Sequence, residues 1–226
     1  MKLTLPNPFS LLLFRGVCFL LASIFIVDIF FLAGSDLFEN TGFGKQFKFF
    51  TLWSFVANFS VCLILFLGMF EFRIRINDSL VAIATMMGIF TVILYWGLFF
   101  IDPSLVNYTD QRLNFLREYY LHLIAPLLLS IEGFFYSRAF KNFLNIAKYA
   151  ALINFGYFAW IEFIIAPLNN FPLGKITKGL PYPFMNDMNS IERLIFATSC
   201  FIFGLLFIWL FTRIQQKIPI SKIGDK

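Results

Sequence analysis

Residues Leu80–Ile101, LVAIATMMGIFTVILYWGLFFI, contain no charged side chain over 22 positions. An α-helix rises about 1.5 Å per residue, so this run is long enough to cross the hydrocarbon core of a bilayer, which is about 30 Å thick. Strands of a transmembrane barrel would alternate polar and apolar residues over shorter segments, and this stretch does not. The run therefore predicts a membrane-spanning helix.

The composition of the whole chain is that of a membrane protein. Of its 226 residues, 59% are hydrophobic, 20% are aromatic and only 14% are charged, a balance more apolar than that of soluble domains. In a soluble chain the net charge of +5 would suggest nucleic-acid binding. Here Lys and Arg lie between apolar runs, where they set topology and contact lipid headgroups. We therefore expect membrane lipids as partners, and no nucleic acid.

Five further apolar runs have a similar length. The sequence thus predicts an all-α, polytopic bundle of six transmembrane helices, in a single integral membrane domain over residues 1–226. The first run contains Arg15 and Asp28 and is too long for the apolar part of a signal peptide, so we interpret it as a retained helix. The predicted helices cover about 9–33, 49–70, 80–101, 119–136, 147–166 and 191–211.

The distribution of Lys and Arg predicts the orientation. One side of the predicted bundle has ten: Lys2, Arg73, Arg75, Arg138, Lys141, Lys148, Arg213, Lys217, Lys222 and Lys226. The other has seven: Lys45, Lys48, Arg112, Arg117, Lys175, Lys178 and Arg193. Because cytoplasmic loops carry the excess of basic residues, both termini are predicted to be cytoplasmic. A bacterial cytoplasmic membrane and the endoplasmic reticulum both fit this pattern.

Polar side chains gather at one depth, toward the non-cytoplasmic end. Thr51, Ser54 and Asn58 are spaced i, i+3, i+7 and share one face of the second helix. His122, the single histidine of the chain, lies about one turn inside the same end of the fourth helix. Ionisable residues within a membrane cost about 2.5 to 3.5 kcal/mol on insertion scales, so they usually face the bundle interior. We therefore expect a functional site at this depth.

The chemistry that these residues allow is nucleophilic attack. A threonine hydroxyl such as that of Thr51 becomes a nucleophile when a base removes its proton, and an imidazole such as that of His122 is the usual base. A carboxylate could orient the ring, as in a catalytic triad; the candidates are Asp28, Glu162 and Glu118. The candidate oxyanion donors are Ser54, Asn58 and backbone amides at the start of the second helix. The same side chains also fit plain roles as helix caps and interhelical hydrogen bonds.

Pro126 follows His122 by four residues. Proline has no backbone N–H, and its ring crowds the carbonyl four residues earlier, which here belongs to His122. We therefore expect a kink in the fourth helix and a His122 carbonyl without its usual partner. Such a bend can widen a cavity at a site, or it can be a packing kink supported by neighbouring helices.

The sequence shows no motif for other chemistries. Cys18, Cys62 and Cys200 lie in three different predicted helices without paired spacing, which predicts neither a disulfide nor a zinc site. A single histidine and no paired-carboxylate motif argue against a metal enzyme. A P-loop, a GxGxxG after a strand and a GxSxG elbow are all missing from the sequence. We expect no metal and no cofactor.

Three blocks in order resemble the androgen-induced protein family of multi-pass membrane proteins. They are FKFFTLWSF (47–55), YYLHLIAPLLLSIE (119–132) and PYPFMND (181–187). The similarity covers the chain from about residue 45 to the end of the sixth helix. It implies a membrane-embedded Thr–His hydrolase of fatty acid esters of hydroxy fatty acids, with Thr51 as the nucleophile and His122 as the base.

Two details of the resemblance bear on the site. The aromatic-proline element of the family matches Tyr182, Pro183 and Phe184, to which we assign no catalytic role. Many bacterial relatives have Asn directly after the Ser or Thr of the second-helix motif, whereas Phe55 follows Ser54 here. The substrate of this chain is therefore left open.

Three hypotheses follow. The leading hypothesis is a carboxylic ester hydrolase that cleaves a lipid ester with a Thr51–His122 dyad. The second is a non-catalytic transporter or lipid-binding protein that uses the same polar layer, with Pro126 as a hinge. The third is acyl transfer to an alcohol in place of water. The sequence leaves open the acyl-chain length, the third catalytic group and the oligomeric state, since no clear GxxxG face is present.

Overall fold

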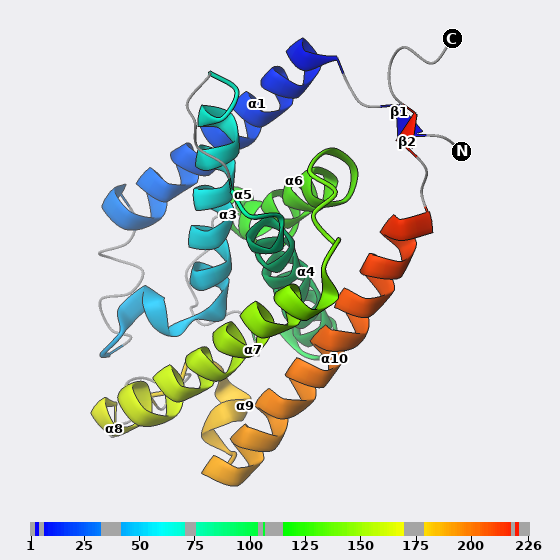
Figure 1. The fold of residues 1–226 in the computed structure, drawn as a ribbon. Coiled ribbons are helices and arrows are strands. Elements are labelled where there is room, and N and C mark those ends of the chain that lie inside the picture. The colour runs from blue at the N-terminus through cyan, green and yellow to red at the C-terminus, as the bar shows by residue number, and fades with distance from the viewer. Residues whose placement is uncertain are drawn as a thin grey trace.

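The computed structural model describes residues 3–4, 7–32, 42–70, 76–103, 106, 115–169, 179–217 and 220–221. Helices make up almost all of this part of the chain (Figure 1). Six helical segments in it are long and apolar enough to cross a membrane, which confirms the predicted all-α polytopic bundle. They span Pro8–Leu32, Phe50–Leu67, Asp78–Ile101, Phe115–Tyr136, Phe143–Leu168 and Ser190–Lys217.

The first three of these segments are simple. The first consists of α1 (Pro8–Val27) and a π-helical turn, η1 (Asp28–Leu32). A short 3-10 helix, η2 (Lys45–Lys48), precedes the second, α3 (Phe50–Leu67). The third is α4 (Asp78–Ile101).

The remaining segments are more divided. The fourth contains α5 (Phe115–Tyr119), η4 (Tyr120–Ile124), α6 (Ala125–Ile131) and η5 (Glu132–Tyr136). The fifth contains α7 (Phe143–Trp160), η6 (Ile161–Ile165) and α8 (Ala166–Leu168). The short α9 (Pro183–Asn186) comes before the sixth, α10 (Ser190–Lys217).

Asparagine side chains define several helix starts. The Oδ1 atoms of Asn7, Asn77 and Asn142 accept hydrogen bonds from backbone amides in the first turns of α1, α4 and α7. Such caps satisfy amides that have no partner inside the helix. The fifth segment therefore starts four residues earlier than the predicted boundary at 147, because apolar pattern alone does not mark a polar cap.

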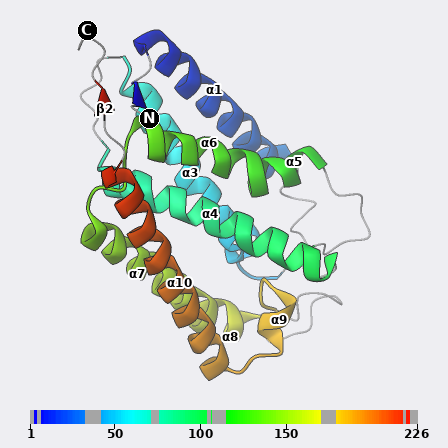
Figure 2. The ribbon, with the colours of Figure 1, turned by 90° about the vertical axis from the view of Figure 1, so that its right-hand side faces the viewer.

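Helix α4 lies in the middle of the bundle. It packs against α3, α6 and α7, and Figure 2 shows it between α6 on one side and α7 and α10 on the other. Val81, Ala82 and Ala84 of α4 are buried in the main core cluster with Phe140 and Ile146. The run that predicts a membrane helix thus forms the centre of the fold.

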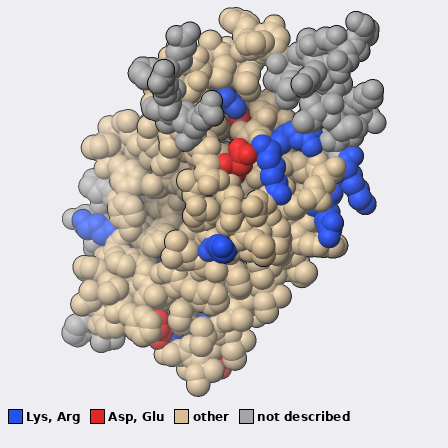
Figure 3. All heavy atoms as spheres, in the orientation of Figure 1, with Lys and Arg blue, Asp and Glu red and all other residues tan. Residues whose placement is uncertain are grey.

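The outer faces are apolar as well. Leu13 and Leu20 of α1 and Leu206 and Trp209 of α10 are exposed, as expected of side chains that face lipid tails. Figure 3 shows a face that is mostly uncharged, with Lys and Arg gathered mainly at the upper right.

Each π-helical turn among the described residues contains an intramembrane ionisable side chain. Asp28 begins η1, His122 lies in η4, Glu132 begins η5 and Glu162 lies in η6. A π turn adds a residue to a helical turn, which redirects the side chains beside it, and such turns are frequent at functional sites. The backbone is therefore irregular where the bundle contains charge.

The chain ends lie together. β1 (Leu3–Thr4) and β2 (Ile220–Ser221) form a short parallel pair, so both ends lie at one end of the bundle (Figure 1). The cytoplasmic location of that end stays a prediction. Eight of the basic residues behind it lie outside the described residues: Lys2, Arg73, Arg75, Arg112, Lys175, Lys178, Lys222 and Lys226.

Gly133 gives a test of the packing at the core. A Cβ atom at this position would lie 2.6 Å from Thr85 Oγ1, and Thr85 is fully buried with its hydroxyl donating to the Val81 carbonyl. We expect Gly133→Ala to lower the apparent Tm in detergent by several degrees, since overpacking costs about 1–3 kcal/mol. Gly156→Ala is the control, because nothing lies within 4 Å of a Cβ there. An equal Tm for wild type and Gly133→Ala would contradict this packing.

Candidate active site

The Thr51 hydroxyl lies at the start of α3 and faces another helix. Eight other Ser and Thr hydroxyls in the described helices donate to the carbonyl four residues earlier, a common arrangement in helices. For Thr51 that carbonyl is Phe47 O, which already accepts the indole N–H groups of Trp53 at 2.8 Å and Trp160 at 3.2 Å. The Thr51 hydroxyl contacts His122 instead, with 3.4 Å between Oγ1 and Nε2.

The His122 ring is buried and has both nitrogens engaged. Its Nδ1 lies 3.0 Å from the Glu118 carbonyl oxygen and 3.2 Å from Glu118 Oε2. Both are acceptors, so the neutral ring carries its proton on Nδ1. The Nε2 lone pair then points toward the Thr51 hydroxyl, which is the arrangement that a general base needs.

Two aromatic side chains of α4 fix His122. The Tyr95 ring stacks on the imidazole, with 3.6 Å between centroids and 10° between planes, and the Tyr95 hydroxyl hydrogen-bonds to Glu118. The Trp96 indole donates to the His122 carbonyl at 2.9 Å. That carbonyl is the one deprived of its usual partner by Pro126, so a neighbouring helix supplies the hydrogen bond that the proline removes.

The irregularity expected at Pro126 is a π-helical turn. In η4 the amide of Ala125 donates to the Tyr120 carbonyl, five residues earlier. Pro126 itself is buried at the start of α6, and a Cβ at Gly88 would lie only 3.2 Å from it. The proline therefore packs closely on α4, beside the turn that contains His122.

Two of the three candidate orienting carboxylates lie away from the ring. Asp28 Oδ2 is 2.7 Å from Arg117 Nε. Glu162 forms an ion pair with Arg193, 2.7 Å from Oε2 to Nε, and also accepts from Ser190. Each is drawn to a guanidinium, because an unpaired carboxylate in a membrane is costly. The carboxylate beside His122 is Glu118.

The candidate oxyanion donors on α3 have different surroundings. The Asn58 amide donates to the Ala125 carbonyl at 3.1 Å, and its Oδ1 accepts from the Cys62 thiol, so Asn58 joins α3 to α6. Ser54 is buried on the same helix face. The Phe50 amide, at the helix start, donates to the Tyr182 hydroxyl at 3.2 Å.

Lys48 lies just before α3 and is fully buried. Its Nζ donates to the Gly179 carbonyl at 3.5 Å, and its own carbonyl accepts from the Tyr157 hydroxyl at 2.7 Å. Burial lowers the pKa of the Lys48 ammonium to about 8. These contacts attach the segment that begins at Gly179 to the start of α3.

A metal centre finds no support in the described residues, where no three His, Cys, Asp or Glu side chains are grouped to hold an ion. The arrangement instead resembles the base and orienting group of a nucleophilic site. The sequence carries no sign of a role in this site for Tyr95, Trp96 and Tyr182, because none of them lies at a helical spacing from Thr51. Glu118 precedes His122 by four residues, a spacing that places both on one helix face.

Comparison with known proteins gives one match. No curated protein and no solved structure was found to match the chain. The family model described as FAR-17a/AIG1-like protein matches residues 11–216, which include all the side chains of the site. This chain belongs to the FAR-17a/AIG1-like protein family.

Proposed function

We propose that this protein is a membrane-embedded hydrolase of lipid esters, with Thr51 as the nucleophile and His122 as the general base. The proposal is carried by the 3.4 Å approach of Thr51 Oγ1 to His122 Nε2, while Nδ1 of the same ring faces Glu118. This distance is longer than in a strong hydrogen bond, and catalytic hydrogen bonds often tighten when substrate binds. Membership of the family supports the same chemistry.

The reaction has two halves. In the first, His122 Nε2 takes the Thr51 proton as Oγ1 attacks the ester carbonyl, and the imidazolium then returns that proton to the leaving alkoxide. In the second, His122 Nε2 removes a proton from water, which attacks the acyl-Thr51 ester; the imidazolium then returns that proton to Thr51 Oγ1 as the fatty acid leaves. Glu118 stabilises the positive charge that forms on the ring in each half.

The substrate class follows from the location and from the resemblance. The site lies in a bundle with apolar outer faces, where esters of long-chain acids are concentrated. We take fatty acid esters of hydroxy fatty acids as the first substrates to test. We also propose that the site lies toward the non-cytoplasmic side of the membrane.

The first prediction concerns the nucleophile and the base. We expect Thr51→Ala and His122→Ala to lose at least about 100-fold in turnover of a fatty-acyl ester by the purified protein in detergent, because each removes a reacting group. Labelling by a fluorophosphonate probe should fall with it. Ser60→Ala removes an exposed hydroxyl of the same helix and should behave as wild type. Labelling that persists in Thr51→Ala would contradict the assignment of Thr51 as the nucleophile.

The second prediction concerns the orienting group. Glu118→Gln keeps the size of the side chain but removes the charge that faces Nδ1, so kcat should fall at least about tenfold. Asp78→Asn is the matched control, since this carboxylate pairs with Lys141 at an exposed position. Turnover by Glu118→Gln equal to that of the control would show that the carboxylate does not assist the base.

A further inference from the structure

The segment before α10 reaches across the bundle to the start of α3. Leu180 and Pro181 are buried. The ring of the next residue, Tyr182, contacts the Phe49 ring edge to face, with 6.2 Å between centroids, and stacks on Phe184 at 5.8 Å. The side chain of Tyr182 therefore has a fixed place beside the proposed nucleophile.

The Tyr182 hydroxyl lies among the polar groups of the α3 start. Phe49, the N-cap residue, supplies no side-chain hydrogen bond. The Tyr182 oxygen instead accepts from the Phe50 amide at 3.2 Å. The residue after Phe50 is Thr51, so the phenol oxygen holds the backbone next to the proposed nucleophile. A helix cap supplied from a distant segment thus fixes the backbone beside the group that the mechanism needs.

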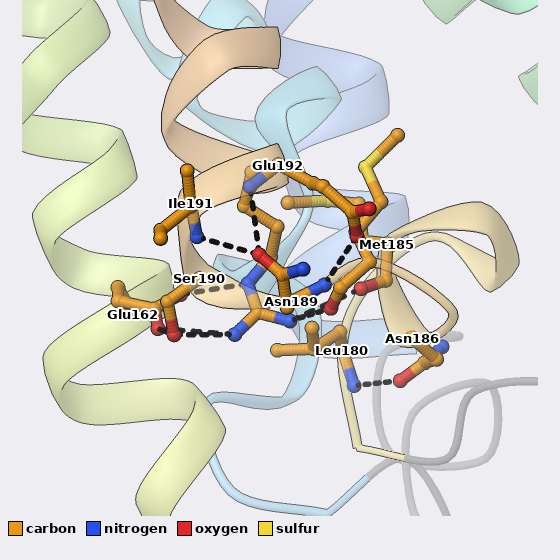
Figure 4. A network of polar contacts seen from close by, with 10 residues as sticks. Glu162, Leu180, Met185, Asn186, Asn189, Ser190, Ile191 and Glu192 are labelled. Atoms are coloured by element: carbon orange, nitrogen blue, oxygen red, sulfur yellow. Dashed lines mark hydrogen bonds and ion pairs between the residues drawn. The ribbon is translucent and has the colours of Figure 1, made fainter.

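A polar network holds this segment in place (Figure 4). Arg193 pairs with Glu162 through two nitrogens, at 2.7 and 3.0 Å, and donates from Nη1 to the Met188 carbonyl at 2.5 Å and the Met185 carbonyl at 3.3 Å. Within the segment, Asn186 accepts from the Leu180 amide and donates to the Tyr182 carbonyl at 3.3 Å. A partly buried ion pair therefore fixes the backbone that carries Tyr182.

The direction of the Thr51 side chain depends on the helical turn that this hydrogen bond fixes. Thr51 is the second residue of α3, and its Oγ1 faces His122 Nε2 at 3.4 Å. The Phe50 amide beside it is held by the Tyr182 oxygen at 3.2 Å. Burial raises the pKa of Tyr182 to about 12, so the phenol stays neutral near pH 7.

We propose that Tyr182 is a positioning residue for the nucleophile: its hydroxyl caps the start of α3 at Phe50 and so holds Thr51 Oγ1 toward His122. This inference rests on the proposed hydrolase function and adds to it a group from a segment more than 100 residues away in the chain.

The test is Tyr182→Phe, which keeps the ring contacts and removes the hydroxyl. We expect kcat for a fatty-acyl ester to fall about 10- to 100-fold, as misplacement of a reacting group does, while KM stays within about twofold because no substrate contact is lost. The rate of fluorophosphonate labelling at Thr51 should fall by the same factor. Tyr149→Phe, at a partly buried ring in the main core cluster, is the control and should match wild type.

A second variant separates positioning from folding. Arg193→Gln releases the segment but leaves the Tyr182 hydroxyl in place. We expect both kcat and the rate of labelling to fall, and KM to change by a smaller factor than kcat. Wild-type kcat and labelling for Tyr182→Phe would overturn the inference, as would a loss confined to KM. If Thr51→Ala itself retains turnover, the proposed function fails; if only Tyr182→Phe retains it, the inference fails alone.

Discussion

The structure depends on the requirement that polar groups inside a bilayer find their partners within the protein. Three arginine–carboxylate pairs meet it, and each joins two spans. Arg15 forms two hydrogen bonds with Glu132, at 2.7 and 3.2 Å, and so connects α1 to η5. The other two pairs connect η1 to α5 and η6 to α10. Each carboxylate lies in a π-helical turn, so the backbone deviates where a pair must form.

The same requirement distinguishes the candidate site from the structural pairs. His122 faces a carboxylate rather than a guanidinium, and this partner occupies only Nδ1. Nε2 is left for Thr51, whose local carbonyl acceptor is taken by two indoles. Hydrogen bonds that satisfy the backbone elsewhere thus leave two side chains to satisfy each other. Under the proposed function, this contact places a base against a nucleophile inside the bundle.

The sequence predicts the six spans and the common depth of Thr51 and His122, because hydropathy and position along a helix determine depth. It does not predict which carboxylate reaches His122. That choice depends on direction around the helix axis, which each π turn alters locally. Asp28 and Glu162 are candidates as well as Glu118, but arginines from other spans pair with both. The i, i+4 spacing of Glu118 and His122 was a usable signal. The position of Tyr182 cannot be predicted from the sequence, since it follows from a tertiary contact with Phe50.

The clamp on His122 by α4 limits how a proton can travel. Tyr95 covers one face of the His122 ring and Trp96 donates a hydrogen bond to the His122 carbonyl. The imidazole is therefore not free to carry a proton by rotating between two positions. In the proposed reaction, the nitrogen that removes a proton from Thr51 must also deliver it. That proposed reaction therefore requires the leaving alkoxide, and later a water molecule, to reach the same nitrogen, so the position of His122 determines the path that both must take through the bundle.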